Sequence, residues 1–220
     1  MRGSSISSSS VRVAPQQERS ARRLAGFLQA AAELFSEIGY EATTMQAIAD
    51  RRNSSIGALY NYFPDKQSVA ATLLSGYADE LHWRLQSLME HSEKLSTVQF
   101  AELFIDCIID FAKERPAYLS LHSVPIPIRR DPAARKALRA IIANAFLTKN
   151  PALSSERSLL AANVAVQIVK GMITLYLESD AKNKSLVVAE FRGVLTSYLE
   201  EVLAKIHPER KGTRQPNPII

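Results

Sequence analysis

Hydrophobic residues recur at spacings of three and four along most of this chain, and that spacing predicts amphipathic helices. Gly39 follows the first such stripe and predicts the end of the first helix, because glycine adopts left-handed backbone conformations at little cost. No segment shows the strict alternation of a half-buried strand, so we expect an all-α fold. The first stripe consists of Leu24, Phe27, Leu28, Ala31, Leu34, Phe35 and Ile38.

Two short helices are expected after Gly39. In the segment EATTMQAIADRR, Thr43 and Gln46 have the spacing of a capping box at a helix N-terminus. Asn53 breaks the apolar pattern, and a third helix is predicted at about residues 55–62. The inward face of the second helix is expected to comprise Met45, Ile48 and Ala49.

Longer helices are predicted over the rest of the chain. Asp65, after Pro64, can cap a fourth helix that reaches about His91. The following apolar segment, about 98–113, is apolar on nearly every side, which is typical of a helix buried among others. Further helices are predicted at about 117–123, 132–148, 154–179 and 185–206. Packing is the expected role of Trp83, Phe104 and Phe111, with pocket lining as the alternative.

The two ends of the chain lack this periodicity. Residues 1–19 are serine-rich and are predicted to form a disordered arm. Arginines within this segment and just after it could make the arm basic. The tail at 208–220 is polar and is predicted to be loose. Between them we expect an N-terminal domain of three helices at 20–66 and a second helical domain at 67–207. The arginines of the basic arm are Arg12, Arg19, Arg22 and Arg23.

Composition narrows the class of protein only slightly. The formal net charge of +5 and the pI of about 9.4 fit an anionic partner such as nucleic acid without establishing one. Cys107 is the single cysteine, so no internal disulfide can form, and it is expected to be a small buried hydrophobe. Neither a signal peptide nor an apolar run of about 18 residues is evident, so we expect a cytoplasmic protein without a membrane span.

The three N-terminal helices lie within about forty residues, and the second and third are short and joined by a tight turn. This is the layout of a helix-turn-helix module, in which the second short helix enters the major groove of DNA. Leu59 is expected to face inward, with Ile48 and Phe35 as neighbours. Tyr60 and Tyr62 are expected to point toward the DNA backbone, where their hydroxyls can donate to phosphates.

Other residues of the module suit the same role. Gly57 would let the backbone approach base edges closely, because it has no side chain. Ser54 or Ser55 would cap the third helix, whose N-terminal amides face an anion. Thr44 and Lys66 stand at the starts of the second and fourth helices and could each contact a phosphate. The structural alternatives are that both tyrosines only cover the fourth helix and that Thr44 is only a cap.

The segment ATTMQAIADRRNSSIGALYNYFPDKQSV, preceded by LQAAAELFSEIGYE, resembles the TetR family of bacterial transcriptional regulators over residues 22–70. The rest of the chain resembles the family only in its long helices. On this resemblance the expected DNA-binding residues are Thr44, Arg52, Ser55, Ile56, Gly57, Ala58, Tyr60, Asn61, Tyr62 and Lys66.

The turn departs from the family pattern. The family usually has Ala-Gly-Val where this chain has Arg52-Asn53-Ser54. Asn53 can replace the glycine, because asparagine tolerates the left-handed conformation. With Ser54 in place of an apolar residue, either the turn is loosened or the serine bonds to the backbone. Arg52 adds a charge that could reach phosphate, and Ile56 could contact a thymine methyl group.

The resemblance implies that residues 71–207 bind a small-molecule effector and form a homodimer through the last two long helices. Such a dimer would bind a palindromic double-stranded operator as a repressor, and a mostly apolar pocket would favour a hydrophobic or amphipathic effector. A regulator that never responds to a ligand is the alternative. The expected pocket residues are Phe104, Cys107, Ile108, Phe111, His122, Phe146, Asn163, Gln167 and Gly171.

Two other classes of function fit the sequence less well. An enzyme is disfavoured, because no phosphate loop, dinucleotide turn, HExxH pair or nucleophile elbow is present and the four histidines lack metal-ligand spacing. Asp106 and Asp110 lie one helical turn apart and could hold a metal, but a solvated face explains them equally. The third class uses the helix-turn-helix fold for protein contacts. We therefore expect no enzyme activity, cofactor or metal.

Overall fold

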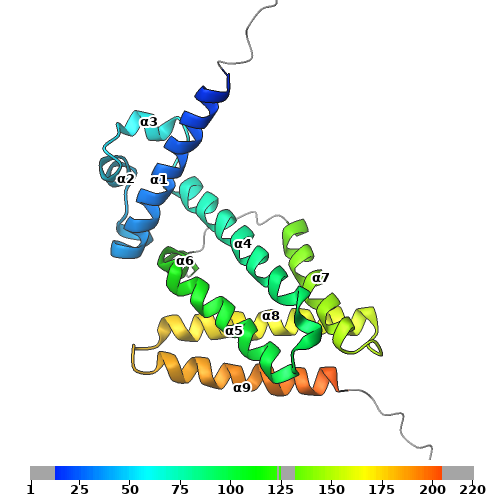
Figure 1. Ribbon diagram of the computed structural model, residues 1–220. Coiled ribbons are helices and arrows are strands. Elements are labelled where there is room, and N and C mark those ends of the chain that lie inside the picture. Colours follow the sequence, from blue (N-terminus) through cyan, green and yellow to red (C-terminus); the bar gives the residue numbers. More distant parts are fainter. Residues whose placement is uncertain (1–12, 123, 125–131, 205–220) are drawn as a thin grey trace, which may run out of the picture. The chain divides into compact units, whose positions relative to one another are not determined.

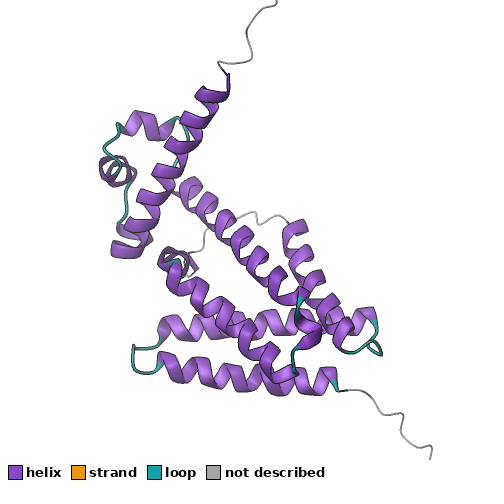
Figure 2. Cartoon of the chain, viewed as in Figure 1, coloured by secondary structure: helices purple, strands orange, loops and turns teal. Residues whose placement is uncertain are grey.

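The computed structural model describes residues 13–122, 124 and 132–204, and every regular element within these ranges is a helix (Figures 1 and 2). This confirms the all-α prediction, and the predicted helices are present with ends shifted by a few residues. A short 3-10 helix, η1, was not predicted. The elements are α1 (Val13–Ala42), α2 (Met45–Arg51), α3 (Ile56–Tyr60), α4 (Lys66–Glu90), η1 (Ser92–Lys94), α5 (Thr97–Glu114), α6 (Pro116–His122), α7 (Pro132–Lys149), α8 (Ser155–Glu178) and α9 (Lys184–Leu203).

The helices form two compact units. Unit one comprises Met1–Ser87 and Phe104–Arg135, and unit two comprises Leu88–Leu103 and Lys136–Ile220. Unit one extends beyond the three N-terminal helices because α1 packs against α6 as well as against α2. The functional division at residue 66 remains a prediction.

The core of unit one is built on the apolar stripe of α1. Phe27 and Phe35 are fully buried, and Ile48 of α2 and Leu59 of α3 join them in one hydrophobic cluster. The last member of the predicted stripe differs, because Ile38 is half exposed. Leu59, Ile48 and Phe35 are fully buried, so they face inward as predicted.

The junction between α1 and α2 corrects one prediction. Gly39 has φ 82° and ψ 166°, which interrupts the helical backbone of α1 as expected, although one more turn follows to Ala42. The buried Thr43 donates its hydroxyl proton to the carbonyl of Gly39 at 2.7 Å. The N-cap is instead Thr44, whose side chain accepts from the N–H of Ala47 at 3.0 Å. The capping box of Thr43 and Gln46 was wrong, and Gln46 donates to Asp50 instead.

The turn between α2 and α3 has the backbone pattern of a Schellman motif. Asn53 has φ 53°, and its N–H donates to the carbonyl of Asp50 at 2.9 Å. The N–H of Ser54 donates to the carbonyl of Ala49 at 2.9 Å. Ser55 then caps α3, because its side chain accepts from the N–H of Ala58 at 3.3 Å. Asn53 thus takes the left-handed position predicted for it, and the turn is closed by backbone bonds.

The N-terminal prediction holds only in part. Helix α1 begins at Val13, so residues 13–19 are helical and not a disordered arm. The apolar stripe begins only at Leu24, so hydrophobic periodicity gives no sign of helix over these residues. Residues 1–12, with Arg12, and the predicted tail at 208–220 lie outside the described residues.

Unit two contains the hairpin of α8 and α9, which lie side by side (Figure 1). Small side chains of α8, such as Ala161 and Ala165, are buried, as are Leu195 and Leu199 of α9. Ser158, also buried, donates to the carbonyl of Ala143 of α7. Five large apolar side chains of the hairpin are 42–60% exposed: Leu159, Leu160, Leu175, Leu186 and Val194.

Helix α8 is also the one helix among the described residues that is long and apolar enough to cross a membrane. An 18-residue window within it has a mean hydropathy of 1.5, and 39% of that window is buried. A core helix of a soluble protein meets the same criteria of length and composition.

Two expectations about packing were wrong. Trp83 was expected to pack in the core, but its side chain is 70% exposed on α4. Helix α5 is not buried on every side, since Val98 and Leu103 are more than 40% exposed. Phe104 and Phe111 are buried as predicted. Period and composition identify these helices but do not determine which neighbours cover each face.

The left-handed turn gives a stability prediction. Asn53→Ala should lower the free energy of unfolding by about 1 kcal/mol, because a Cβ without a polar group disfavours φ near 53°. Asn53→Gly should stay within about 0.5 kcal/mol of the parent, since glycine accepts this conformation but has a more flexible unfolded state. Urea denaturation of the three proteins measures both differences. Equal stability of the alanine and glycine variants would contradict the role given to the turn.

The contact between α1 and α2 gives a pH prediction. Arg51 donates to both carboxylate oxygens of Glu37, at 2.9 and 2.7 Å, and this hydrogen bonding lowers the pKa of Glu37. A carboxyl with a lowered pKa in the folded state stabilises the fold above its unfolded pKa, and the contribution is lost as the pH falls through the folded value. Denaturation of Glu37→Gln between about pH 7 and pH 3 should therefore show less loss of stability on acidification than the parent. Parallel curves for the two proteins would refute this.

Candidate nucleic-acid interface

Helix α3 has only five residues, and its outer surface is defined by the way it is anchored. Leu59 is 0% exposed in the core of unit one, whereas Tyr60 is 50% exposed. Gly57 and Asn61 are also exposed. Ile56 and Ala58 are half-buried and pack against the core cluster, so their side chains are only partly available for contacts outside the protein.

Gly57 leaves open space at the surface of α3. A Cβ placed on it would meet no heavy atom within 4 Å. No packing within unit one therefore requires glycine at this position, and its backbone φ is not in the left-handed region. Thr44 is likewise exposed at the N-terminus of α2, and Ser55 is exposed at that of α3.

Tyr62 is placed differently from the prediction. Its side chain is half-buried, and its ring centroid lies 5.9 Å from that of Phe27. Its hydroxyl lies 3.2 Å from the hydroxyl of Ser20 on α1. The ring thus fastens the C-terminal end of α3 to α1, and only the hydroxyl end remains near the surface. A contact between this hydroxyl and a DNA phosphate remains a prediction.

Lys66 has partners within unit one that the sequence did not reveal. Its ammonium donates to the carbonyls of Tyr40 and Glu41 at 2.6 and 3.0 Å and lies 4.3 Å from the centroid of the Tyr40 ring. These bonds satisfy carbonyls at the C-terminal end of α1. An ammonium carries three protons, so one remains for a further acceptor.

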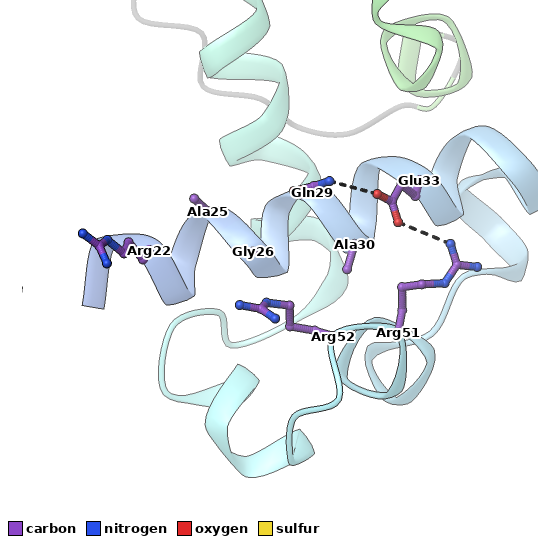
Figure 3. A pocket seen from close by; sticks show the side chains of 8 residues that line it. All are labelled: Arg22, Ala25, Gly26, Gln29, Ala30, Glu33, Arg51 and Arg52. Atoms are coloured by element: carbon purple, nitrogen blue, oxygen red, sulfur yellow. Dashed lines mark hydrogen bonds and ion pairs between the residues drawn. The ribbon is translucent and has the colours of Figure 1, made fainter. Parts of the chain in front are cut away.

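Figure 3 shows Arg52 extending from the turn before α3 toward α1, Arg51 reaching toward Glu33, and Arg22 on α1. One open hollow of about 360 Å³ is lined by Arg19, Arg22, Arg23, Arg52, Asn53 and Ser54. The adjacent hollow of about 470 Å³ is lined by Arg22, Ala25, Gly26, Gln29, Ala30, Glu33, Arg51 and Arg52. The sequence pointed to Arg19, Arg22, Arg23 and Arg52 but not to Arg51 or Gly26, and the signal for Gly26 was a glycine inside the first helical stripe.

The predicted effector residues of unit one are mostly apolar. Phe104, Ile108 and Phe111 are buried. Cys107 is half-buried rather than fully buried, and burial raises the pKa of its thiol. The ring centroid of His122 lies 5.8 Å from that of Tyr118. These residues occupy α5 and α6.

The predicted effector residues of unit two have varied surroundings. Phe146 is buried, with its ring centroid 5.9 Å from that of Phe100. Asn163 accepts from Nε of Arg139 at 2.5 Å and donates to the carbonyl of Leu159 at 2.9 Å, so its polar groups already have partners. Gln167 and Gly171 are exposed on α8, and a Cβ on Gly171 would lie 3.4 Å from the Phe191 ring of α9. A pocket formed by both sets remains a prediction.

The described residues hold no group of three or more His, Cys, Asp or Glu side chains placed to bind a metal ion.

Comparison with known proteins places these features in a family. Residues 27–73 match the model of bacterial regulatory proteins of the tetR family, and residues 98–199 match that of the tetracyclin repressor-like C-terminal domain. The HTH-type transcriptional repressor KstR2 of Rhodococcus jostii is 37% identical over 62 residues, which are 28% of this chain and 30% of that protein. KstR of Mycobacterium tuberculosis is 41% identical over 59 residues, 27% of this chain and 25% of that protein. The chain thus spans about 30% or less of these two relatives' length.

Solved structures extend the likeness to most of the chain. A TetR-family transcriptional regulator from Streptomyces coelicolor has a TM-score of 0.62 and 19% identity, covering 82% of this chain and 99% of that one. A single-residue variant of TetR from Acinetobacter baumannii, solved with minocycline, has a TM-score of 0.58 and 19% identity, covering 80% and 93%. At this identity the likeness concerns the fold. The two family models together match more than half of the chain, which therefore belongs to the TetR family of bacterial transcriptional regulators, DNA-binding proteins rather than enzymes.

Proposed function

We propose that this chain is a dimeric repressor that binds a palindromic operator through α3 and is released by a small hydrophobic or amphipathic effector. The observation that carries the proposal is the anchoring of α3, with Leu59 fully buried while Gly57, Tyr60 and Asn61 are exposed. A helix-turn-helix module reads DNA in this way, with the core side of its recognition helix fixed and the other side free. The relatives named as repressors support the direction of regulation.

In this proposal the exposed residues have separate tasks. Gly57 allows the backbone of α3 to approach base edges, and Tyr60 donates its hydroxyl proton to a phosphate. Thr44, Ser55 and Lys66 contact phosphates at helix starts, where unpaired N–H groups also favour an anion. The remaining proposed contacts are Arg52, Ile56, Ala58, Asn61 and the hydroxyl of Tyr62.

The proposed dimer uses the outer face of the α8 and α9 hairpin. Its five exposed apolar side chains would form an unusually apolar surface on a monomer in water. A two-fold axis through such a face would pair the hairpin with its copy and present two α3 helices to two half-sites. The apolar character of α8 is then explained without a membrane, which fits a cytoplasmic protein.

The effector would act by binding one state of the dimer more tightly than the other, because a ligand shifts an equilibrium only by its difference in affinity. The structure solved with minocycline shows that a protein of this fold binds a small molecule. For this chain, the apolar Phe104, Ile108, Phe111 and Phe146 support a hydrophobic or amphipathic ligand.

The first test is selection from random DNA duplexes, followed by binding measurements with two glycine variants. Parent protein should recover a palindrome, and Gly57→Ala should weaken binding to it at least about tenfold, because a methyl group would keep the helix from the base edges. Gly76→Ala is the matched control: this exposed glycine of α4 also has no atom within 4 Å of an added Cβ. Both substitutions should preserve or raise stability, because alanine favours helix.

Failure to enrich any sequence at low salt, with a folded dimer, would refute DNA binding and favour protein contacts by the same module. Equal affinity of Gly57→Ala and Gly76→Ala for a recovered palindrome would refute the close approach of α3.

The dimer face has its own test. Leu160→Glu on α8 should raise the dimer dissociation constant at least about tenfold, because it would place an unpaired carboxylate in the interface. Val98→Glu on α5 is the control, because Val98 is comparably exposed but lies outside the hairpin. Analytical ultracentrifugation measures both constants. A dimer unaffected by Leu160→Glu, or weakened equally by Val98→Glu, would contradict the proposed interface.

A further inference from the structure

We propose that Arg19, Arg22, Arg23 and Arg52 form a second phosphate-binding surface, which binds the sugar–phosphate backbone of operator DNA beside α3 and carries no sequence preference. This arginine surface is held in place by a contact between Arg52 and Gly26. The inference rests on the proposed function and extends the expected DNA contact from the helix-turn-helix residues to the N-terminal half of α1.

The first observation is the close approach of Arg52 to α1. A Cβ built on Gly26 would lie 2.1 Å from Nε of Arg52, 2.9 Å from Cζ and 3.0 Å from Cδ. The guanidinium end therefore occupies space that any other residue at position 26 would fill (Figure 3). Glycine in the middle of a helix costs about 1 kcal/mol relative to alanine, so its presence here fits a need for this space.

The second observation is the charge of the hollow. Four arginines and no carboxylate line the hollow that includes Asn53 and Ser54. Arg22 forms an exposed ion pair with Glu18 at 2.5 Å. Positive charges that line one hollow repel each other, and a bound anion would reduce that repulsion. A guanidinium suits phosphate well, because its planar donors can form two parallel bonds to phosphate oxygens.

Arg51 provides an internal contrast. It is the last residue of α2, and its guanidinium is paired with Glu37 and lies 3.5 Å from Glu33. The charge of Arg51 is therefore balanced within unit one, and its ion pairs connect α2 to α1. Arg52, one residue later, is directed to Gly26 on the arginine-lined side, and this difference separates a structural arginine from one suited to bind an external anion.

The arginine surface adjoins α3 at both ends. Arg52 lies three residues before Ser55, the N-cap of α3. At the other end, the hydroxyls of Ser20 and Tyr62 lie 3.2 Å apart, next to Arg19 in the chain. A duplex lying on α3 would therefore have its backbone near this stretch of α1. Both hollows are shallow and open, and four arginines along one surface suit an extended polyanion better than a single small anion.

The test measures affinity against salt concentration for the full chain, with the selected palindrome and with a random-sequence duplex. Each phosphate contact contributes about 0.9 to the slope of log K against log salt, so Arg52→Ala should reduce the slope by about 1.8 for a dimer, or about 0.9 per protomer. Affinity should fall by the same factor for both duplexes, because phosphate contacts carry no sequence information. Lys136→Ala, which removes an exposed charge from α7, should leave the slope unchanged.

Gly26→Ala tests the position of the Arg52 side chain without removing its charge. The added methyl group must displace the end of the Arg52 side chain, which is flexible, so the protein should stay folded and its melting temperature should not fall. The slope should nevertheless decrease as in Arg52→Ala, and the double variant should show no further decrease, since both changes remove one contact. Gly76→Ala should change neither slope nor affinity.

The possible outcomes separate this inference from the proposed function. A parent that binds no duplex would overturn both. A parent that binds the palindrome and loses affinity in Gly57→Ala, but keeps its salt slope in Arg52→Ala and Gly26→Ala, would overturn the arginine surface alone. Arg52→Ala weakening the binding of inorganic phosphate without changing the duplex slope would also overturn it, in favour of a small-anion site.

Discussion

The surface proposed to face DNA depends on the burial of one leucine. A helix of five residues is too short to persist in water, because the nucleation cost is spread over too few hydrogen bonds. Helix α3 is instead held by Leu59 in the core of unit one, by the Ser55 cap at its start and by the Tyr62 ring against Phe27 at its end. This arrangement leaves the opposite side of the helix free of internal contacts, which is the geometry that DNA recognition needs.

The turn before α3 also places Arg52 beside the arginines of α1. Because Asn53 takes the left-handed conformation, the chain reverses within a few residues and brings α3 back toward α1. Arg52, just before this reversal, lies against α1 at Gly26. The departure of this turn from the usual Ala-Gly-Val of the family therefore retains the required backbone and adds a guanidinium to a surface of arginines. One local change in sequence has both a conformational and an electrostatic consequence.

Features that depend on local periodicity could be predicted from the sequence, and those that depend on tertiary contacts could not. The spacing of apolar residues and the turn signals between them located the α-helices of the described residues, apart from the first turns of α1, and the tolerance of asparagine for positive φ identified Asn53. The bonds of Lys66 to the end of α1 and the contact of Arg52 with Gly26 join residues more than 20 positions apart. Nothing in the local pattern encodes such contacts, so the roles of these residues changed once the fold was known.

Hydroxyl-radical footprinting of the dimer on its selected operator would test recognition through α3. Two α3 helices related by a two-fold axis should protect two tracts, with centres about 10–10.5 base pairs or a multiple of that spacing apart. Protection should also extend to backbone beside each tract, where the arginine surface would lie. A single protected tract, or protection without two-fold symmetry, would contradict a dimeric regulator that reads DNA through α3.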